Sequence, residues 1–591
     1  MFTFSIFLTL AVVVACFLAF FLTRIEPELI LGSGIVLLMF AGILAVERGL
    51  SGFSNPGLIT IACLYVIAAG LRKTGALEPF IRRTLDSASS LQRAQLRIIS
   101  PVAILSTILN NTPIVAALIP GVISWSRRRG ISPSRLLLPI SYAAILGGTC
   151  TLIGTSTNLV VNGMLLQQVP DLALGIFEIA WVGVPVAAIG ILYLTLFGQR
   201  LLKDRIPAHE QIENVRKYTV EMQVEPGGEL VGKTIRQAGL RSLHGLYLAE
   251  MQRDDLVLFA MGPDTVLRSG DRLVFVGMVS SIGELLGIQG LRPLSEQVFK
   301  LQEGQSPQRL VEAVIAPKNP LIGKTIREGK FRSRYNAVVL AVIRDGERLD
   351  VKAGDVVLRH ADTLLMLARR SFIEQHRISN EFLFVNTVGD EVRTDNRRAR
   401  VAWFNVSTFV LLAAFNLVPI VQAALLSAGL MVVTRCLSWS EAKKSLDLQV
   451  LLVIAFAFGL GTAIEDSGTA MFLAESVIRN VGSHPFFLLI LVYFITLILT
   501  ETITNNAAAV ISYSISFGLV SALDYNIVPY AVAIMIAASA SFMTPLGYQT
   551  NLMVYGAGGY RFVDYLRLGA PLSLLTAIVA LAIIPRVWPL T

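Results

Sequence analysis

The chain has 591 residues, of which 54% are hydrophobic and 15% charged, and its mean hydropathy is +0.65. This composition excludes a wholly water-soluble protein and predicts several membrane spans of about 20 apolar residues each. Most of the charged residues fall between positions 201 and 400, so we expect a water-soluble middle region between two membrane halves.

The first half contains apolar segments at residues 2–23, 29–46 and 58–71. Residues 2–23 lack a basic start and a small-residue cleavage site, so they are predicted as a span rather than a signal peptide. A re-entrant hairpin is predicted at residues 95–126, followed by a helix interrupted at "GTSTN" and a last span at residues 180–197.

The net charge of +9 is distributed as in a membrane protein and does not indicate nucleic-acid binding. Residues 167–174 contain no Lys or Arg. Other loops are basic, through Arg72, Lys73, Arg82 and Arg83, through residues 127–129, and through residues 397–400. This positive-inside pattern, with five preceding spans, predicts an outer N-terminus and a cytoplasmic middle region.

The middle region contains an internal duplication. "ELVGKTIRQAGLRS" (229–242) matches "PLIGKTIREGKFRS" (320–333) at a shift of 91 residues, and apolar runs indicate strands. We predict two small α+β modules, at residues 213–298 and 303–385. The first motif also fits the phosphate-binding loop pattern, but its second copy has Lys318 in place of the first glycine, which favours a turn.

The second half repeats the order of the first, with spans at 403–418, 420–433 and 449–460, a hairpin at 485–520 and a last span at 570–584. An interrupted helix is predicted around "TPLGYQTN". The distance from Gly75 to Asn158 is 83 residues, as is that from Gly468 to Asn551. Two membrane repeats, residues 1–200 and 400–591, with an odd number of spans each would be inverted, as in many secondary transporters.

Four polar patches occur at membrane depth, where uncompensated polar groups are costly. Such residues often bond neighbouring helices, but matched spacing in both halves favours one central binding site. Half-helix N-termini attract anions, and freed oxygens suit sodium ions, here predicted near Asn111, Asn158, Asn506 and Asn551. The candidate substrate or ion ligands are Asn110, Asn111, Thr112, Gly154, Thr155, Thr157, Asn158, Thr504, Asn505, Asn506, Thr544, Pro545, Thr550 and Asn551.

Glu501 is an acidic residue within these patches, in "ETITNN". It is a candidate for ion coupling, for proton movement or for stabilising the hairpin. No Lys or Arg occurs in the patches, and the scarcity of titratable groups favours sodium over proton coupling.

An enzyme is not expected. The five histidines are scattered, and neither a nucleophile elbow nor a pair of catalytic carboxylates is present. The four cysteines (Cys16, Cys63, Cys150 and Cys436) lie in or beside apolar segments without paired spacing, so no disulfide framework, zinc site or other cofactor is predicted.

The membrane halves resemble the divalent anion:sodium symporter family. "NNTP" occupies the place of its Ser-Asn-Thr signature, "GGTCTLIGTSTNLV" resembles its Gly-Thr-x-x-Asn helix break, and "TETITNN" and "TPLGYQTNLMVYGAGGY" occupy the matching places in the second half. The resemblance implies an α-helical polytopic membrane protein with inverted repeats and two re-entrant hairpins. It also implies a homodimer that moves its substrate by an elevator mechanism.

The middle modules resemble TrkA-C domains, the C-terminal domains of regulators of potassium transport, which bind small ligands or mediate assembly. Ser156 and Thr157 replace the Pro-Pro common in dicarboxylate carriers, which favours an inorganic anion. We therefore expect a multi-pass cell-membrane importer of a divalent oxyanion, sulfate first, coupled to sodium, with cytoplasmic modules that bind an unknown small ligand. The alternatives are a dicarboxylate carrier, an efflux permease for arsenite-like species, and a membrane nutrient sensor with little flux.

Overall fold

The computed structural model divides the chain into two units. Unit 1 comprises Met1–Asp204, Glu391–Tyr555 and Tyr560–Thr591, and unit 2 comprises Arg205–Asp390 with Gly556–Gly559. The described residues are 2–23, 25–76, 91–172, 174–204, 218–240, 243, 246–253, 256–259, 261–277, 285, 287–293, 308–316, 319–344, 347–349, 351, 353–376, 381–387, 396–415, 417–473, 475, 483–545 and 547–591. The predicted basic residues Arg82 and Arg83 lie outside this set.

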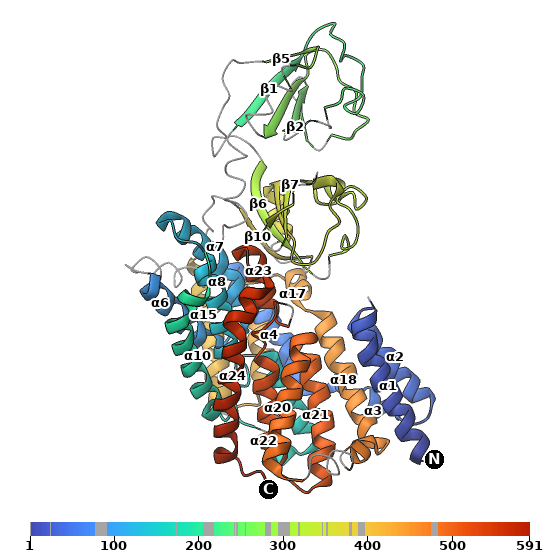
Figure 1. Cartoon of the computed structure of the whole chain (residues 1–591), viewed down its shortest axis with the longest axis vertical. Coiled ribbons are helices and arrows are strands. Elements are labelled where there is room, and N and C mark those ends of the chain that lie inside the picture. The colour runs from blue at the N-terminus through green and yellow to red at the C-terminus, as the bar shows by residue number, and fades with distance from the viewer. Residues whose placement is uncertain are drawn as a thin grey trace. The chain divides into compact units, whose positions relative to one another are not determined.

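The first half of unit 1 is helical (Figure 1). In chain order its main helices are α1 (Phe2–Leu22), α2 (Pro27–Phe40), α3 (Val46–Gly49), η1 (Ser51–Ser54), α4 (Pro56–Thr74), α6 (Leu91–Ser106), α7 (Asn111–Arg129), α8 (Ser134–Gly148), α9 (Ser156–Gln168), η2 (Pro170–Leu172) and α10 (Ala180–Leu201).

The second half of unit 1 follows a similar order. Its helices are α15 (Asn396–Ala414), α16 (Ile420–Val433), α17 (Trp439–Ser445), α18 (Leu448–Asp466), α20 (Pro485–Thr502), α21 (Asn505–Ala522), α22 (Ile527–Ser539), α23 (Gln549–Gly558) and α24 (Phe562–Val587). α24 begins eight residues before the predicted span because Asp564 caps it: the Asp564 carboxylate accepts a hydrogen bond from the Arg561 backbone N–H at 2.9 Å.

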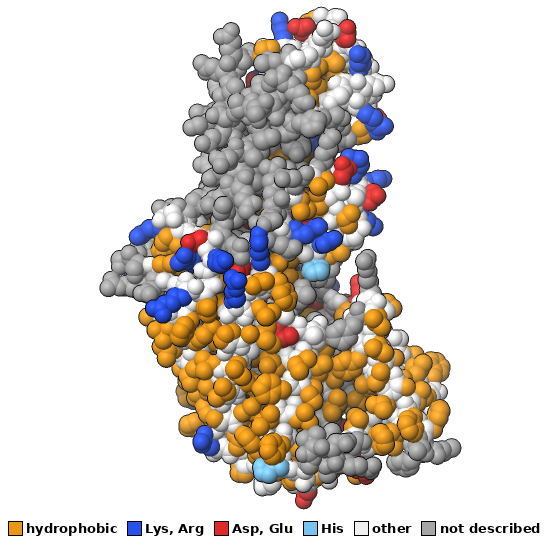
Figure 2. All heavy atoms as spheres, in the orientation of Figure 1, with side chains coloured by type: hydrophobic (Ala, Val, Ile, Leu, Met, Phe, Trp, Pro, Cys, Tyr) orange, Lys and Arg blue, Asp and Glu red, His pale blue; other side chains and the backbone are white. Residues whose placement is uncertain are grey.

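Unit 1 has the surface of a membrane protein. Among the described residues, five helices are long and apolar enough to cross a bilayer, namely α4, α10, α18, α20 and α24. Figure 2 shows hydrophobic side chains over most of the visible lateral face, with Lys and Arg gathered near the end where α7 and α23 are labelled in Figure 1.

Each half contains two helix interruptions where the polar patches were predicted. α6 ends at Ser106 and α7 begins at Asn111, and α20 ends at Thr502 and α21 begins at Asn505. The first break, residues 149–155, separates α8 from α9, and the second break, residues 540–548, separates α22 from α23. The predicted interruptions are therefore present at all four places.

A glycine of the last helix in each half allows close packing against these breaks. A Cβ added at Gly183 of α10 would overlap the carbonyl oxygen of Thr149, and one at Gly569 of α24 would overlap that of Phe542. Thr149 and Phe542 lie at corresponding positions of the two breaks, 393 residues apart. Only glycine lets each helix approach the exposed backbone so closely.

Unit 2 contains two antiparallel five-stranded sheets. The first has the order β3-β2-β4-β1-β5, from β1 (Tyr218–Val224), β2 (Leu246–Arg253), β3 (Leu256–Phe259), β4 (Arg272–Gly277) and β5 (Leu291–Pro293). The second has the order β10-β6-β9-β7-β8, from β6 (Gln308–Ile315), β7 (Ala337–Arg344), β8 (Glu347–Arg348), β9 (Thr363–Arg369) and β10 (Phe382–Thr387).

The second sheet repeats the first at the shift of 91 residues. The strand orders correspond, and the irregularity between Leu248 and Glu250 recurs between Val339 and Ala341. The described helices of unit 2 are short, such as α13 (Phe331–Tyr335) and α14 (Arg370–His376), so the described part of each module is mainly β structure.

A buried ion pair recurs in both sheets. Arg253 donates to Asp271 through Nε at 2.8 Å and through Nη2 at 2.7 Å, and Asp271 is 1% exposed. Arg344 and Asp362 make the same bidentate contact, with both distances 2.7 Å. Each aspartate also accepts a backbone N–H three residues earlier, so each pair fixes the turn before a central strand.

The "GKT" motifs form turns, as the sequence suggests. Gly232 and Gly323 have φ angles of 84° and 80°, which glycine adopts readily. In the first copy the N–H groups of Gly232, Lys233 and Thr234 donate to protein oxygens. These groups are therefore not available to cradle a phosphate.

The second copy has the same arrangement. Glu328 accepts hydrogen bonds from Thr325, whose backbone N–H and hydroxyl lower the pKa of the Glu328 carboxyl.

We predict that Asp271→Ala lowers the stability of the first sheet by about 3 kcal/mol, because the substitution leaves the Arg253 guanidinium without its carboxylate. Hydrogen–deuterium exchange should accelerate in β1, β2 and β4. Asp362→Ala is the matched control and should accelerate exchange in β6, β7 and β9 instead. Equal acceleration in both sheets from either change would contradict this account.

We also predict that Gly183→Ala and Gly569→Ala each destabilise unit 1 by about 1–3 kcal/mol, the usual cost of overpacking, because the added methyl group meets backbone that cannot move aside. Gly429 of α16 is the control, since a Cβ there meets no atom within 4 Å. Gly429→Ala should keep or slightly raise the melting temperature in detergent. Melting curves that treat all three variants alike would refute the packing argument.

Candidate functional site

Four helices begin at the predicted polar patches, namely α7, α9, α21 and α23. The N-terminus of a helix carries unpaired N–H groups and a partial positive charge. Thr155 and Thr504, the residues preceding α9 and α21, make no side-chain cap to these groups. The starts of α9 and α21 therefore offer N–H donors to the site.

The first break is secured by Asn158. Its Nδ2 donates to the carbonyl oxygens of Gly148 at 3.4 Å and Thr151 at 2.9 Å. Gly154 donates its N–H to the Thr151 hydroxyl at 3.1 Å. One fully buried amide thus satisfies two carbonyls that the helix has left unpaired.

Asn551 does the same for the second break. Its Nδ2 donates to Ser541 at 2.9 Å and Thr544 at 3.2 Å, and Gly547 donates its N–H to the Thr544 hydroxyl at 3.2 Å. The acceptors lie ten and seven residues before the asparagine, as they do for Asn158. The two breaks therefore have the same internal hydrogen bonds.

The two asparagines differ in their side-chain oxygens. Asn551 Oδ1 accepts from the Ser141 hydroxyl of α8 at 2.8 Å. Asn158 Oδ1 has no hydrogen-bond partner among the described residues, although Asn158 is fully buried. A buried acceptor without a donor is costly unless something else binds it.

Tyr548 joins the first hairpin to both breaks. Its hydroxyl accepts from Asn111 Nδ2 at 2.5 Å and lies 3.1 Å from the Thr155 hydroxyl. Asn111 Oδ1 accepts from Ser106 at the end of α6. Tyr548 and Thr155 occupy corresponding positions 393 residues apart, so equivalent residues of the two halves meet here.

The second hairpin contacts the start of α9, just after the first break. Asn506 Oδ1 accepts from Ser156 at 3.0 Å and from Thr157 at 3.5 Å, and Asn505 Nδ2 donates to Thr157 at 3.3 Å. On the other side, Thr112 donates to Gln549 at 3.3 Å.

If the first residues of α7 and α21 are aligned, Asn111 corresponds to Asn505 and Thr112 corresponds to Asn506. This correspondence differs by one residue from an overlay of the two Asn-Asn pairs.

Glu501 lies beside the second break. Its carboxylate accepts from the Met543 N–H at 2.8 Å and from the Ser541 hydroxyl at 3.2 Å, and its carbonyl accepts from Thr544 at 3.3 Å. The corresponding residue of the first half is Thr107, whose carbonyl accepts from Thr151. The second half therefore carries a carboxyl group that the first half lacks.

The remaining predicted residues are placed as follows. Thr550 is buried and bonded to Ser141 at 2.9 Å, and Pro545 is buried within the second break. Asn110 accepts from the Thr112 N–H at 3.4 Å, and Thr504 is exposed. The structure thus places most predicted residues in one group of contacts, with Asn110 and Thr504 at its margin.

Sequence reasoning missed further residues whose side chains take part in these contacts, among them Ser106, Ser141, Thr151, Ser156, Ser541, Tyr548 and Gln549. Tyr548 and Gln549 stand within the patch "TPLGYQTN" and could have been chosen from it. Ser106, Ser141 and Ser541 lie in largely apolar sequence, and a hydroxyl in such a segment gives no signal of what it faces.

The arrangement can bind an anion and small cations without basic side chains. The donors are N–H groups, hydroxyls and amides, and the candidate cation ligands are neutral oxygens and one carboxylate. Among the described residues no three His, Cys, Asp or Glu side chains gather as for a transition metal.

Comparison with known proteins agrees with this chemistry. A putative sulfur deprivation response regulator of Chlamydomonas reinhardtii is 36% identical, covering 95% of this chain and 98% of the relative. An uncharacterised transporter of Synechocystis sp. is 33% identical, with coverages of 96% and 95%. A probable sodium/sulfate cotransporter of C. reinhardtii is 28% identical, with coverages of 91% and 83%.

A family model described as a citrate transporter matches residues 17–537, that is, most of the first membrane half, the region between the halves, and the second half as far as α22. With its apolar helices, this match makes the chain a multi-pass membrane protein. The chain belongs to the citrate transporter family.

Proposed function

We propose that the protein is a secondary active transporter that imports a divalent oxyanion, sulfate first, together with sodium. Relatives named sodium/sulfate cotransporters support the substrate class. Helix starts lie beside neutral hydroxyl and amide donors at the polar patches. This arrangement supports an anion site that needs no Lys or Arg. Such a site suits a tetrahedral anion whose charge is spread over several oxygens.

We propose that the two membrane halves are inverted repeats around this site. The matched hydrogen bonds of Asn158 and Asn551 and the contact between Thr155 and Tyr548 support a two-fold relation. An elevator motion would carry both hairpins and both breaks together. Homodimerisation, cell-membrane localisation and cytoplasmic modules remain part of this proposal.

The observation that carries the sodium assignment is the unpaired oxygen of Asn158. Of the four asparagines predicted near sodium, the other three have their Oδ1 atoms engaged. Asn111 accepts from Ser106, Asn506 from Ser156 and Asn551 from Ser141. Asn158 Oδ1 alone among these four has no donor in the described part of the chain, so it is the best placed to bind a cation.

We propose that the two modules of unit 2 are TrkA-C-like domains that bind a small ligand and regulate transport. The repeated sheet order and ion pair support a pair of similar domains. Their "GKT" turns have no role in phosphate binding in this proposal.

The second candidate function is a membrane nutrient sensor. The specific observation in its favour is the relative named a putative sulfur deprivation response regulator, which this chain matches over nearly its whole length. A sensor would bind the anion at the same site and report its presence through unit 2. Flux separates the two functions.

We predict that purified protein in proteoliposomes takes up labelled sulfate when an inward sodium gradient is imposed. Excess thiosulfate should block uptake and succinate should not. The reason is that Ser156 and Thr157 replace the Pro-Pro common in dicarboxylate carriers, which favours an inorganic oxyanion. Uptake driven only by a proton gradient would overturn sodium coupling. Absence of sulfate uptake by folded protein would direct the test to succinate and then to the sensor.

We predict that Asn158→Ala raises the sodium concentration for half-maximal uptake by about tenfold or more, because the change removes an amide oxygen that has no donor among the described residues. Asn551→Ala is the matched control, since it removes the same two backbone hydrogen bonds from the other break. In sodium-free buffer Asn551→Ala should melt at the lower temperature of the two, because it also loses the hydrogen bond from Ser141. An equal rise in sodium requirement for both would refute the assignment to Asn158.

A further inference from the structure

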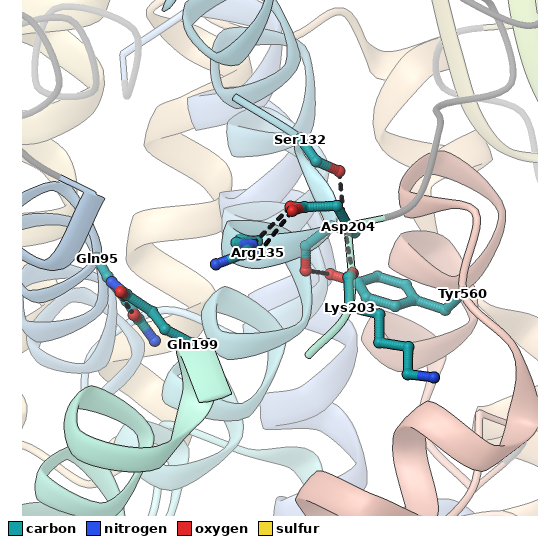
Figure 3. A network of polar contacts seen from close by, with 8 residues as sticks. Gln95, Ser132, Arg135, Gln199, Lys203, Asp204 and Tyr560 are labelled. Carbon is teal, nitrogen blue, oxygen red and sulfur yellow. Dashed lines mark hydrogen bonds and ion pairs between the residues drawn. The ribbon is translucent and has the colours of Figure 1, made fainter. Parts of the chain in front are cut away.

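The end of α10 is the last part of unit 1 before the chain continues into unit 2. Beyond Leu201 the chain is extended, since Leu202 has φ −87° and ψ 131°. Two residues later Asp204 meets Arg135, which donates to its two carboxylate oxygens through Nε at 2.5 Å and Nη2 at 2.6 Å (Figure 3). This bidentate geometry fixes the direction of the chain as well as its position.

Further contacts fix the same segment. The Ser134 hydroxyl donates to the carbonyl oxygen of Lys203 at 3.1 Å, and Tyr560 donates to the carbonyl oxygen of Ser134. Tyr560 also accepts the N–H of Leu138 at 2.8 Å. We call these residues, Ser134, Arg135, Lys203, Asp204 and Tyr560, the α8–α10 junction. Figure 3 labels Arg135, Lys203, Asp204 and Tyr560 of this group.

The junction acts on the first turn of α8. This helix packs against α6, α7 and α10, and nearly all of its residues are buried. Its other end is Gly148, which precedes the first break and gives a carbonyl to Asn158. α8 also carries Ser141, the donor to Asn551. A displacement of α8 would therefore reach both breaks.

The other connection to unit 2 leads into a different group of helices. α15 begins at Asn396 and packs against α16 and α4. Trp403 of α15 donates its indole N–H to the carbonyl oxygen of Ala76, just beyond α4, at 2.9 Å. The two connections of unit 2 are thus fixed to α8 and α10 on one side and to α4 and α16 on the other.

We infer that the α8–α10 junction is the mechanical link through which unit 2 controls the anion site, with Arg135 as its positioning residue. The inference rests on the proposed transport function, in which the helices that bear the breaks move during transport. The Arg135–Asp204 pair holds the chain at Asp204 to the start of α8, so a force on the chain at that point reaches α8. A loose segment at residues 202–204 would absorb such a force.

The Arg135–Asp204 pair can be removed to test this role without unfolding the protein, because both side chains are accessible to water. The Arg135 side chain is 28% exposed and that of Asp204 is 62% exposed. Exposed ion pairs contribute little to folding stability. Removal of the pair is therefore expected to leave the fold intact and to affect transmission.

The experiment compares full chains with chains in which residues 225–370 are replaced by a flexible linker of equal length. The junction variants are Arg135→Ala, Asp204→Ala and the charge swap Arg135→Asp with Asp204→Arg. Arg200→Ala, an exposed arginine at the same end of α10, is the matched control. The readouts are the initial rate of sulfate uptake and hydrogen–deuterium exchange at residues 149–155, which needs no substrate.

In the wild type and in Arg200→Ala, replacing residues 225–370 should change the rate and the exchange at the break by at least threefold. In the two alanine variants the same replacement should change both by less than 1.5-fold, and the charge swap should restore the response. A replacement effect of equal size in all backgrounds, or none in the wild type, would overturn the inference. If uptake is absent but exchange follows the predicted pattern, transport fails as the function and the link remains.

Discussion

The structure depends on how backbone groups are satisfied where helices stop inside an apolar unit. Residues 149–155 and 540–548 interrupt helices among buried neighbours, where an unpaired carbonyl or N–H costs several kcal/mol. The side-chain amides of Asn158 and Asn551 satisfy this requirement, because each donates to two backbone carbonyls at its own break. Glycines at 183 and 569 let the final helices pack against the same backbone. The polar site is therefore a consequence of building stable breaks.

The function proposed here follows from small differences between two similar halves. Ser141 engages the side-chain oxygen of Asn551, while that of Asn158 has no donor among the described residues. Glu501 provides a carboxylate beside the second break where the first half has Thr107. In the proposed function the two similar halves provide helix starts for an anion, and the differences between the halves separate the roles of individual side chains. α8 carries both Ser141 and the junction with Asp204, so it connects the site to the segment that enters unit 2.

Much of this arrangement could be predicted from the sequence because it depends on local signals. Polar residues inside apolar runs, with Gly or Pro in or beside three of the four patches, gave all four interruptions, and the 91-residue repeat anticipated two similar sheets. The turn at "GKT" followed from its imperfect second copy. Contacts between distant segments could not be predicted, since Ser141 and Asn551 are 410 residues apart and an isolated serine in an apolar helix has no recognisable partner. The helix starts of the hairpins were also offset by one residue from the Asn-Asn pairs, because the tips differ in length.

The central claim is that sodium and a divalent oxyanion bind at one site formed by the two breaks and the two hairpins. Equilibrium binding of labelled sulfate to the purified full chain tests it most directly, in buffers where sodium is replaced by choline at constant ionic strength. The account predicts saturable binding that requires sodium and is displaced by thiosulfate. Saturable binding of equal affinity in choline, or no binding by folded protein in sodium, would contradict it.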